Sequence, residues 1–182
     1  MARYWRRGVV LVAGLLCWLP AVADAQPATA ARTATTLCSG QSTDGFEGGV
    51  SSWTASAGVI TNSTAEQPHS GSWYAWLDGY GTTHTDTLSR APSIPAGCHA
   101  TITFWLHIDT AETTTTTAYD KLTLKAGTTT LATWSNLNHI VGYAQHTVTV
   151  PAGTTSLVFT GTEDSSLQTS FTIDDITTTI SS

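Results

Sequence analysis

Threonine alternates with apolar residues along much of this chain, and this period of two constrains its fold more than any other feature. The clearest run is Ala100 to Thr110, in which every second residue is a large apolar one: Ile102, Phe104, Leu106 and Ile108. Successive side chains of a β-strand point to opposite faces of a sheet, so this run predicts a half-buried strand. Residues 26–182 include 36 threonines, and β-branched residues favour strands.

Similar runs predict further strands at 121–125, 131–134, 146–150, 156–160 and 170–180, with weaker ones at 57–61, 72–78 and 84–89. Turn signals such as Asp78-Gly79 and Pro151-Ala152-Gly153 separate them. Helical periodicity is absent after the first 25 residues. We therefore predict an all-β domain, an antiparallel β-sandwich of the jelly-roll kind, with no helices after the leader.

Residues 1–25 have the pattern of a secretory signal peptide. Three arginines precede an apolar run of 12 residues, Gly8 to Leu19, and Ala23-Asp24-Ala25 matches a cleavage site. The apolar run is too short to span a membrane. We expect a secreted, extracellular protein without membrane insertion. In it, residues 26–43 would be a flexible N-terminal segment and residues 44–182 the β-sandwich domain.

The charge balance narrows the classes of partner. Residues 26–182 carry four Lys and Arg against twelve Asp and Glu, a net charge of −8. Nucleic acid and anionic lipid are bound through basic patches, which such a chain can hardly form. This composition suits cations or neutral polar ligands instead.

Two cysteines follow the leader, Cys38 and Cys98. Export would place them in an oxidising environment, so we expect one Cys38–Cys98 disulfide. It would tie the N-terminal segment to the body of the domain. The alternative is a pair of free thiols.

Carboxylates lie near both ends of the expected domain. Glu47 stands in Gly45-Phe46-Glu47-Gly48, and Asp174 and Asp175 stand in the final alternating run. These acids meet only if the first and last strands are neighbours, and grouped carboxylates favour a hard cation. We therefore predict a structural calcium ion at Glu47, Asp174 and Asp175. The alternative is that the two aspartates cap loops through backbone N–H groups while Glu47 is solvated.

Catalytic signatures are missing from the sequence. It has no G-x-S-x-G, H-E-x-x-H or C-x-x-C motif. Gly79-Tyr80-Gly81 lacks the third glycine and the following helix of a dinucleotide-binding loop. We expect a binding protein and not an enzyme.

Two polar groups are candidate ligand contacts. Asp78 stands close in sequence to His84 and Asp86, and His107 and Asp109 share one face of the 100–110 strand. Either group could contact a sugar or a metal. The simpler alternative is that each belongs to a loop stabilised by local aspartate hydrogen bonds.

Trp105 and Tyr80 are candidate platforms for a sugar ring. Trp105 falls on the polar face of the 100–110 strand, and Tyr80 lies in a glycine-rich loop. Carbohydrate binders stack sugar faces on exposed aromatic rings. The alternative is that both rings are packed into the core.

These motifs together resemble known families. The patterns F-E-G-G…W and F-T-I-D-D-I resemble jelly-roll carbohydrate-binding modules and MAM-type domains, as does the segment His69-Ser70-Gly71-Ser72-Trp73-Tyr74-Ala75. The segments 76–81, 107–112 and 161–166 are similar to those of accessory domains of secreted bacterial peptidases. By this resemblance, the structural calcium of the family would fall on Glu47 and on Asp174 or Asp175.

The sequence thus predicts a secreted, non-catalytic module that binds a polysaccharide or a cell-surface glycan and holds a structural calcium ion. The alternative is an accessory domain whose partner is a secreted protein. It would act with a secreted peptidase as a substrate binder, chaperone or inhibitor, although no peptidase domain accompanies these motifs.

Overall fold

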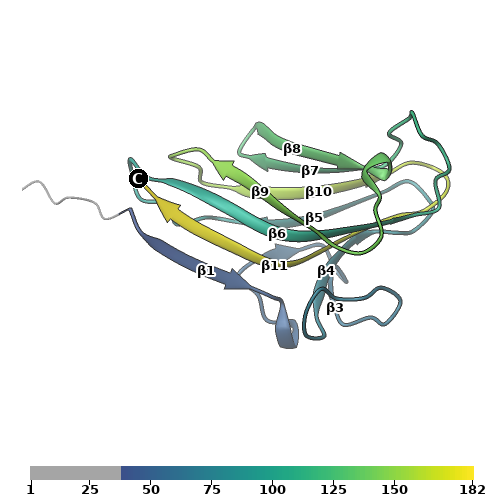
Figure 1. Ribbon diagram of the computed structural model, residues 1–182, viewed down its shortest axis with the longest axis horizontal. Coiled ribbons are helices and arrows are strands. Elements are labelled where there is room, and N and C mark those ends of the chain that lie inside the picture. Colours follow the sequence, from purple (N-terminus) through teal and green to yellow (C-terminus); the bar gives the residue numbers. More distant parts are fainter. Residues whose placement is uncertain (1–37) are drawn as a thin grey trace, which may run out of the picture. The chain divides into compact units, whose positions relative to one another are not determined.

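The alternating segments of the sequence form antiparallel strands in two facing β-sheets (Figure 1). The computed structural model describes residues 38–182. The predicted signal peptide and most of the expected N-terminal segment lie outside these residues.

The larger sheet has six strands in the order β3-β4-β11-β6-β9, with β1 also paired to β11. Its strands are β1 (Gly40–Asp44), β3 (Ile60–Thr61), β4 (Tyr74–Asp78), β6 (His99–Thr110), β9 (Ala144–Val150) and β11 (Thr169–Ser181). The first half of β11 pairs with β4, and the second half pairs with β1. Figure 1 shows β1 running beside β11.

The smaller sheet has five strands in the order β2-β5-β10-β7-β8. Its strands are β2 (Thr54–Ala55), β5 (His84–Arg90), β7 (Lys121–Ala126), β8 (Thr129–Ser135) and β10 (Leu157–Glu163). All pairings in both sheets are antiparallel. The predicted jelly-roll β-sandwich is therefore confirmed.

Helical structure is limited to two single turns in the part of the chain that the structure describes. Both are 3-10 helices, η1 (Glu47–Gly49) and η2 (Asn136–Asn138). The expectation of no helices therefore holds for α-helices and misses these two turns. β1 also starts within the segment expected to be flexible. It is a polar, mostly exposed strand, so no apolar period marks it in the sequence.

The core lies between the sheets and is built from the apolar positions of the alternating runs. Phe104 of β6 and Phe159 of β10 meet across the sandwich in a T-shaped pair, with ring centroids 5.0 Å apart. Trp134 of β8 packs edge-on against Phe104 at 5.4 Å. All three are buried, so the period of two does place the core face of these strands.

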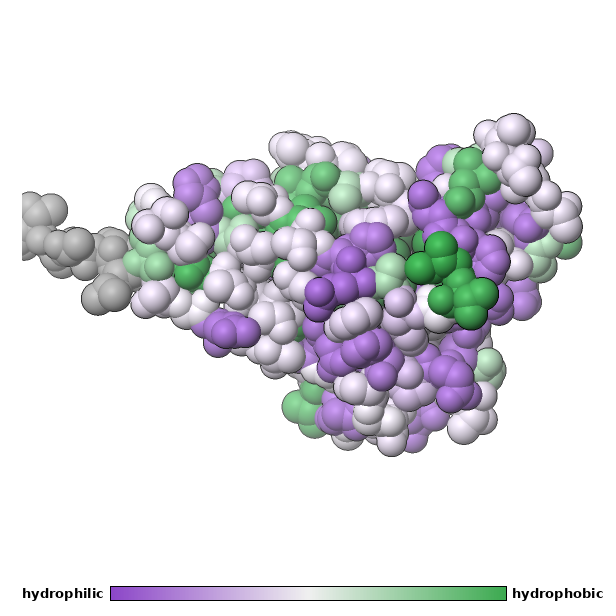
Figure 2. Space-filling model, in the orientation of Figure 1, coloured by the Kyte–Doolittle hydropathy of each residue, from purple (hydrophilic) through white to green (hydrophobic). Residues whose placement is uncertain are grey.

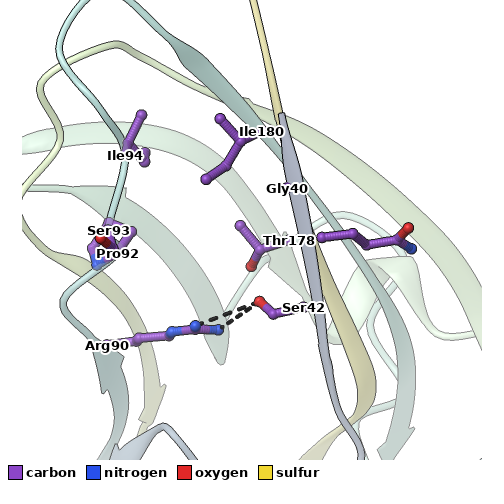
Figure 3. A pocket seen from close by; sticks show the side chains of 9 residues that line it. Gly40, Ser42, Arg90, Pro92, Ser93, Ile94, Thr178 and Ile180 are labelled. Carbon is purple, nitrogen blue, oxygen red and sulfur yellow. Dashed lines mark hydrogen bonds between the residues drawn. The ribbon is translucent and has the colours of Figure 1, made fainter. Parts of the chain in front are cut away.

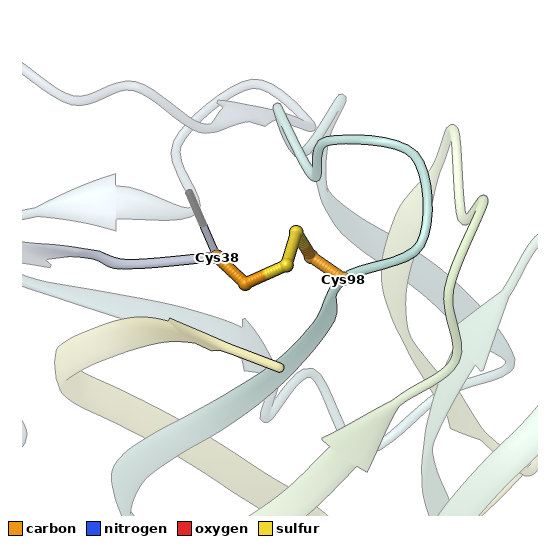
Figure 4. Close-up of a disulfide and its surroundings, with 2 residues drawn as sticks. All are labelled: Cys38 and Cys98. Carbon is orange, nitrogen blue, oxygen red and sulfur yellow. A yellow bond between two sulfur atoms is a disulfide. The ribbon is translucent and has the colours of Figure 1, made fainter. Parts of the chain in front are cut away.

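The predicted Cys38–Cys98 disulfide is present, with Cα atoms 5.3 Å apart (Figure 4). Cys98 immediately precedes β6, and Cys38 lies just before β1. The bridge therefore fixes the start of β1 to the start of β6, an inner strand of the larger sheet. In residues 38–182 we find no helix with the length and apolar character needed to cross a bilayer.

Candidate functional site

The first strand, β1, and the last strand, β11, are neighbours. This is the condition under which Glu47 can lie near Asp174 and Asp175. Asp44 of β1 lies opposite Ile176 of β11, and Gly40 lies opposite Ile180. The Asp44 carboxylate accepts hydrogen bonds from Phe46 N, Ser51 Oγ, Ser52 N and Ser52 Oγ. It thereby holds the turn that carries Glu47.

Glu47, Asp174 and Asp175 surround one loop, residues 69–73. Glu47 Oε1 accepts hydrogen bonds from the backbone N–H groups of Ser72 and Trp73, at 2.9 and 3.1 Å. Gly71 has φ of +60°, and a Cβ there would lie 2.1 Å from Glu47 Oε1. Any other residue at Gly71 would be strained by the positive φ and would displace the Glu47 carboxylate.

The two aspartates hold the other end of this loop. Asp174 Oδ2 accepts from the N–H groups of His69 and Ser70, and Asp175 pairs with His69 Nδ1 at 2.7 Å. Asp175 has φ of +48°, and the pairing of β11 with β6 shifts register after Asp174. This β-bulge re-aims the side chains. Burial raises the pKa of Asp174 to about 6, while the N–H of Ser70 favours its charged form.

The calcium ion stays a prediction. The three acids are gathered at one loop, as predicted, but their hydrogen bonds to backbone N–H groups also fit the loop-capping alternative. Within residues 38–182, no three or more His, Cys, Asp and Glu side chains are arranged so that they would hold a metal ion.

Trp105 lies on the outer face of the larger sheet but is covered there. The His69 imidazole stacks on its indole with centroids 4.0 Å apart and planes 14° apart. Tyr143 packs edge-on against His69 and donates a hydrogen bond from its hydroxyl to Gln67 O. The 62–72 segment therefore lies over Trp105, which neither joins the core nor presents a free ring face on that side.

His107 and Asp109 point from the same face of β6, as the alternation predicts. His107 Nδ1 is 2.9 Å from Gly142 O, and Asp109 is exposed. Glu66 approaches from the covering segment. Burial raises the pKa of Glu66, and the Asp109 charge raises it further. His107 is thus held by a backbone carbonyl, and neither His107 nor Asp109 lines one of the hollows described below.

Tyr80 and Asp78 meet at an open hollow of about 350 Å³. Its lining residues are Gly58, Thr61, Trp76, Asp78, Gly79 and Tyr80. Tyr80 is 54% exposed, and its ring packs against the His84 imidazole at 3.9 Å. Glu163 accepts hydrogen bonds from the N–H groups of Tyr80 and Gly81, which fixes the loop. Of the predicted contacts, these two residues are brought together, while Trp105, His107 and Asp109 lie on the outer face of β6.

Asp78 forms the inner wall of this hollow and is buried, with 4% of its surface exposed. Neither carboxylate oxygen has a hydrogen-bond partner among residues 38–182. Burial raises the pKa of Asp78 to about 8, and the carboxylates of Asp86 and Glu163 add to the shift. The indole N–H of Trp76, in the same hollow, is also buried and unpartnered.

A second hollow, of about 220 Å³, lies between β1, β11 and the segment after β5 (Figure 3). Arg90 reaches across it toward Ser42 Oγ, with N–O distances of 3.4 and 3.5 Å. Figure 3 shows Ile94 and Ile180 forming its apolar wall. No catalytic grouping of acids and bases lines it.

Three exposed apolar residues lie in the segment that follows β8. Leu137 is 38% exposed, Ile140 50% and Val141 97%. Figure 2 shows hydrophobic patches at this end of the sandwich, bordered by hydrophilic residues. Apolar surface with a polar border is typical of a protein-binding region.

Comparison with known proteins finds likeness in structure only. No family model matches the sequence, and no curated protein matches it. The K1 cleaved adhesin domain of Lys-gingipain from Porphyromonas gingivalis W83 has a TM-score of 0.54 at 19% identity, over 76% of this chain and 97% of that domain. The K3 domain of the same protein scores 0.55 at 18% identity, over 77% and 99%.

A carbohydrate-binding structure is similar to the same degree. The CBM22-1 xylan-binding domain from Paenibacillus barcinonensis has a TM-score of 0.52 at 14% identity, covering 80% of this chain and 97% of that domain. The chain has the fold shared by these adhesin and carbohydrate-binding domains. The predicted resemblance to jelly-roll carbohydrate-binding modules is thus confirmed for the fold.

Sequence reasoning missed several residues of these sites. Asp120 and Glu163 are buried, and both continue the apolar face of an alternating run. Asp120 precedes Leu122 by two positions, and Glu163 follows Gly161 by two. The parity of the runs could have placed both acids inside. No comparable signal marks His69, whose position depends on how the 62–73 segment folds back over β6.

Proposed function

We propose that this protein is a secreted, non-catalytic module that binds carbohydrate at the hollow beside Tyr80. The observation that carries the proposal is the exposed Tyr80 ring, held on a loop at the edge of a concave surface. The fold supports it, since the xylan-binding domain described above has the same architecture.

The hollow has the features that a sugar site needs. Sugar rings offer apolar faces, which stack on aromatic side chains, and hydroxyls, which need polar partners. Tyr80 and Trp76 supply aromatic surface, and Thr61 supplies a hydroxyl in the same lining. The Glu163 hydrogen bonds restrain the Tyr80 backbone, so little freedom is lost when a ligand binds.

A glycan array followed by calorimetry with soluble polysaccharides tests the proposal. Tyr80→Ala should weaken binding by about tenfold, because an aromatic stacking contact and its buried area are lost. The melting temperature should stay within about 2 °C of the wild type, since the ring is exposed.

Tyr119→Ala is the matched control. Tyr119 is 46% exposed and lines a different hollow, with Glu112 and Asp164. It should leave both affinity and stability unchanged. Equal loss of binding in the two variants, or no binding to any glycan, would contradict the proposal.

We also propose that the acids around the 69–73 loop hold a structural calcium ion. Calcium prefers hard oxygen ligands and mixes carboxylates with backbone carbonyls. Glu47 and Asp175 are partly or fully exposed and retain free lone pairs beyond the hydrogen bonds described. When bound there, the ion would offset the repulsion between Asp174 and Asp175 and fix the loop to β11.

The second candidate function is binding of a secreted protein, as an accessory domain that acts with a secreted peptidase. The exposed apolar residues Leu137, Ile140 and Val141 favour it. Pull-down from culture supernatant with the wild type and with Val141→Asp distinguishes the two. Capture that depends on Val141 but not on Tyr80 would favour the protein partner.

A further inference from the structure

Four carboxylic acids are buried at one end of the sandwich, between the two sheets. Asp78, Asp86, Asp120 and Glu163 expose 4%, 2%, 0% and 4% of their surface. They come from β4, β5, the residue before β7, and β10. Strand pairing brings them together, because Gly161 of β10 lies opposite both Asp86 and Leu122. Buried carboxylates of this number need compensation.

Three of these acids are compensated by hydrogen bonds. Asp86 accepts from Asp78 N and lies 3.4 Å from His84 Nε2. Glu163 accepts from Tyr80 N, Gly81 N and Thr169 N. Asp120 accepts from Asp164 N and from the Thr169 hydroxyl. Each is therefore a structural acceptor that holds a loop or a strand end.

Asp78 differs from the other three. Both of its carboxylate oxygens are buried, and in the part of the chain that the structure describes neither has a hydrogen-bond donor. Its side chain turns inward from the end of β4, with φ of +62°, and lies against β10. A Cβ at Gly161 would be 2.3 Å from Asp78 Oδ2, so the absence of a side chain at Gly161 makes the room for this carboxylate.

Among residues 38–182, no lysine or arginine forms an ion pair with the Asp78 carboxylate. The ion pairs among residues 38–182 are His69 with Asp175 and His84 with Asp86, and neither includes a lysine or an arginine. The Asp78 carboxylate therefore faces three other acids with no positive side chain bonded to it. Such a group must take up either a proton or a cation.

We propose that a hard metal cation of the calcium class binds at Asp78, between β4 and β10. Calcium takes most of its ligands from neutral oxygens, namely backbone carbonyls, side-chain oxygens and water, so one carboxylate can anchor it. The other three acids would keep their hydrogen bonds from backbone N–H groups, and their negative charges would attract the cation toward Asp78. These acids are Asp86, Asp120 and Glu163. Among residues 38–182 no three His, Cys, Asp or Glu side chains converge as metal ligands, so the other ligands of this cation would have to be neutral oxygens.

This site is separate from the calcium site proposed at Glu47, Asp174 and Asp175, which surrounds the 69–73 loop. A cation at Asp78 would connect the two sheets directly beneath the loop that carries Tyr80. It would hold the inner wall of the Tyr80 hollow, to which Asp78 contributes. The inference does not depend on what the hollow binds.

Asp78→Asn is the direct test. Asparagine has the same shape and tolerates a positive φ, but it removes the charge. Asp109→Asn is the matched control, because it makes the same change at an exposed position on β6. Each protein is stripped with EDTA, dialysed against calcium and analysed for bound metal and melting temperature.

We expect Asp78→Asn to bind one calcium ion fewer than the wild type and Asp109→Asn to bind the same number. The calcium-dependent rise in melting temperature should shrink only in Asp78→Asn. Equal calcium content in all three proteins would overturn the proposal and identify a proton as the partner of Asp78.

If Asp78→Asn does not fold, the ¹³C chemical shift of the wild-type Asp78 carboxyl group, measured with and without calcium, distinguishes the cation from the proton. An ionised group that responds to calcium at neutral pH supports the cation, and a protonated group that ignores calcium overturns it.

Discussion

Two aspartates show how surroundings set the state of the same side chain. Asp44 accepts four hydrogen bonds from Phe46, Ser51 and Ser52. Burial alone would raise its pKa, but the Ser52 side chain and backbone and the other donors outweigh burial, so the pKa of Asp44 is lowered. Asp78 has no donor, and burial raises its pKa. Asp44 is half-buried and has four donors, whereas Asp78 is buried and has none among residues 38–182, so burial and the lack of donors act together on Asp78.

The Asp44 anchor has a testable pH dependence. Because its pKa is lower in the folded state, its contribution is present above the unfolded pKa, about 4, and is lost as the pH falls through the folded value. Asp44→Asn should cost about 1–3 kcal/mol of unfolding free energy at pH 7. Urea unfolding at several pH values should show the difference from wild type shrinking only below about pH 4. A difference that is constant from pH 7 to pH 3 would show that the charge is not what matters.

Strands could be predicted from the sequence where one face is buried and the other is not. The Ala100–Thr110 run forms β6, and the run at 170–180 forms most of β11. β1 escaped prediction because its residues are polar and mostly exposed, so its place depends on pairing with β11 and on the disulfide. The covering of Trp105 by His69 depends on a fold-back of the 62–73 segment, which has no period to follow.

The link between β1 and β6 depends on the Cys38–Cys98 disulfide, which closes a segment with a sequence separation of 60. In the chain-entropy description, opening such a loop costs about 4 kcal/mol of stability. The Cys38→Ser, Cys98→Ser double variant should therefore unfold at markedly lower urea, with β1 exchanging its amide protons first. Stability within about 1 kcal/mol of the wild type would show that strand pairing alone holds β1.

At the scale of the whole molecule, the chain joins its two ends and gathers its acids at separate places. Pairing of β1 with β11 brings the Glu47 turn near the Asp174–Asp175 bulge. The facing sheets enclose Asp78 elsewhere. Residues 26–182 carry a net charge of −8, so the acids within each group repel one another unless hydrogen bonds or cations intervene. A requirement for cations would thus be a property of the architecture, spread over two sites.

Calcium should therefore stabilise the protein. An ion that binds only the folded state adds about 2.7 kcal/mol at a hundred times its Kd, which corresponds to roughly 10 °C in melting temperature for a domain of this size. EDTA should remove that gain.

Asp175→Ala should abolish the part of the calcium-dependent stabilisation that comes from the site at Glu47, Asp174 and Asp175, since Asp175 both faces the 69–73 loop and pairs with His69. Asp78→Asn should leave this part intact, and the two effects should add because the sites share no ligand. Identical melting curves in millimolar calcium and in EDTA, with no metal by elemental analysis, would leave loop capping by backbone N–H groups as the whole role of Glu47, Asp174 and Asp175.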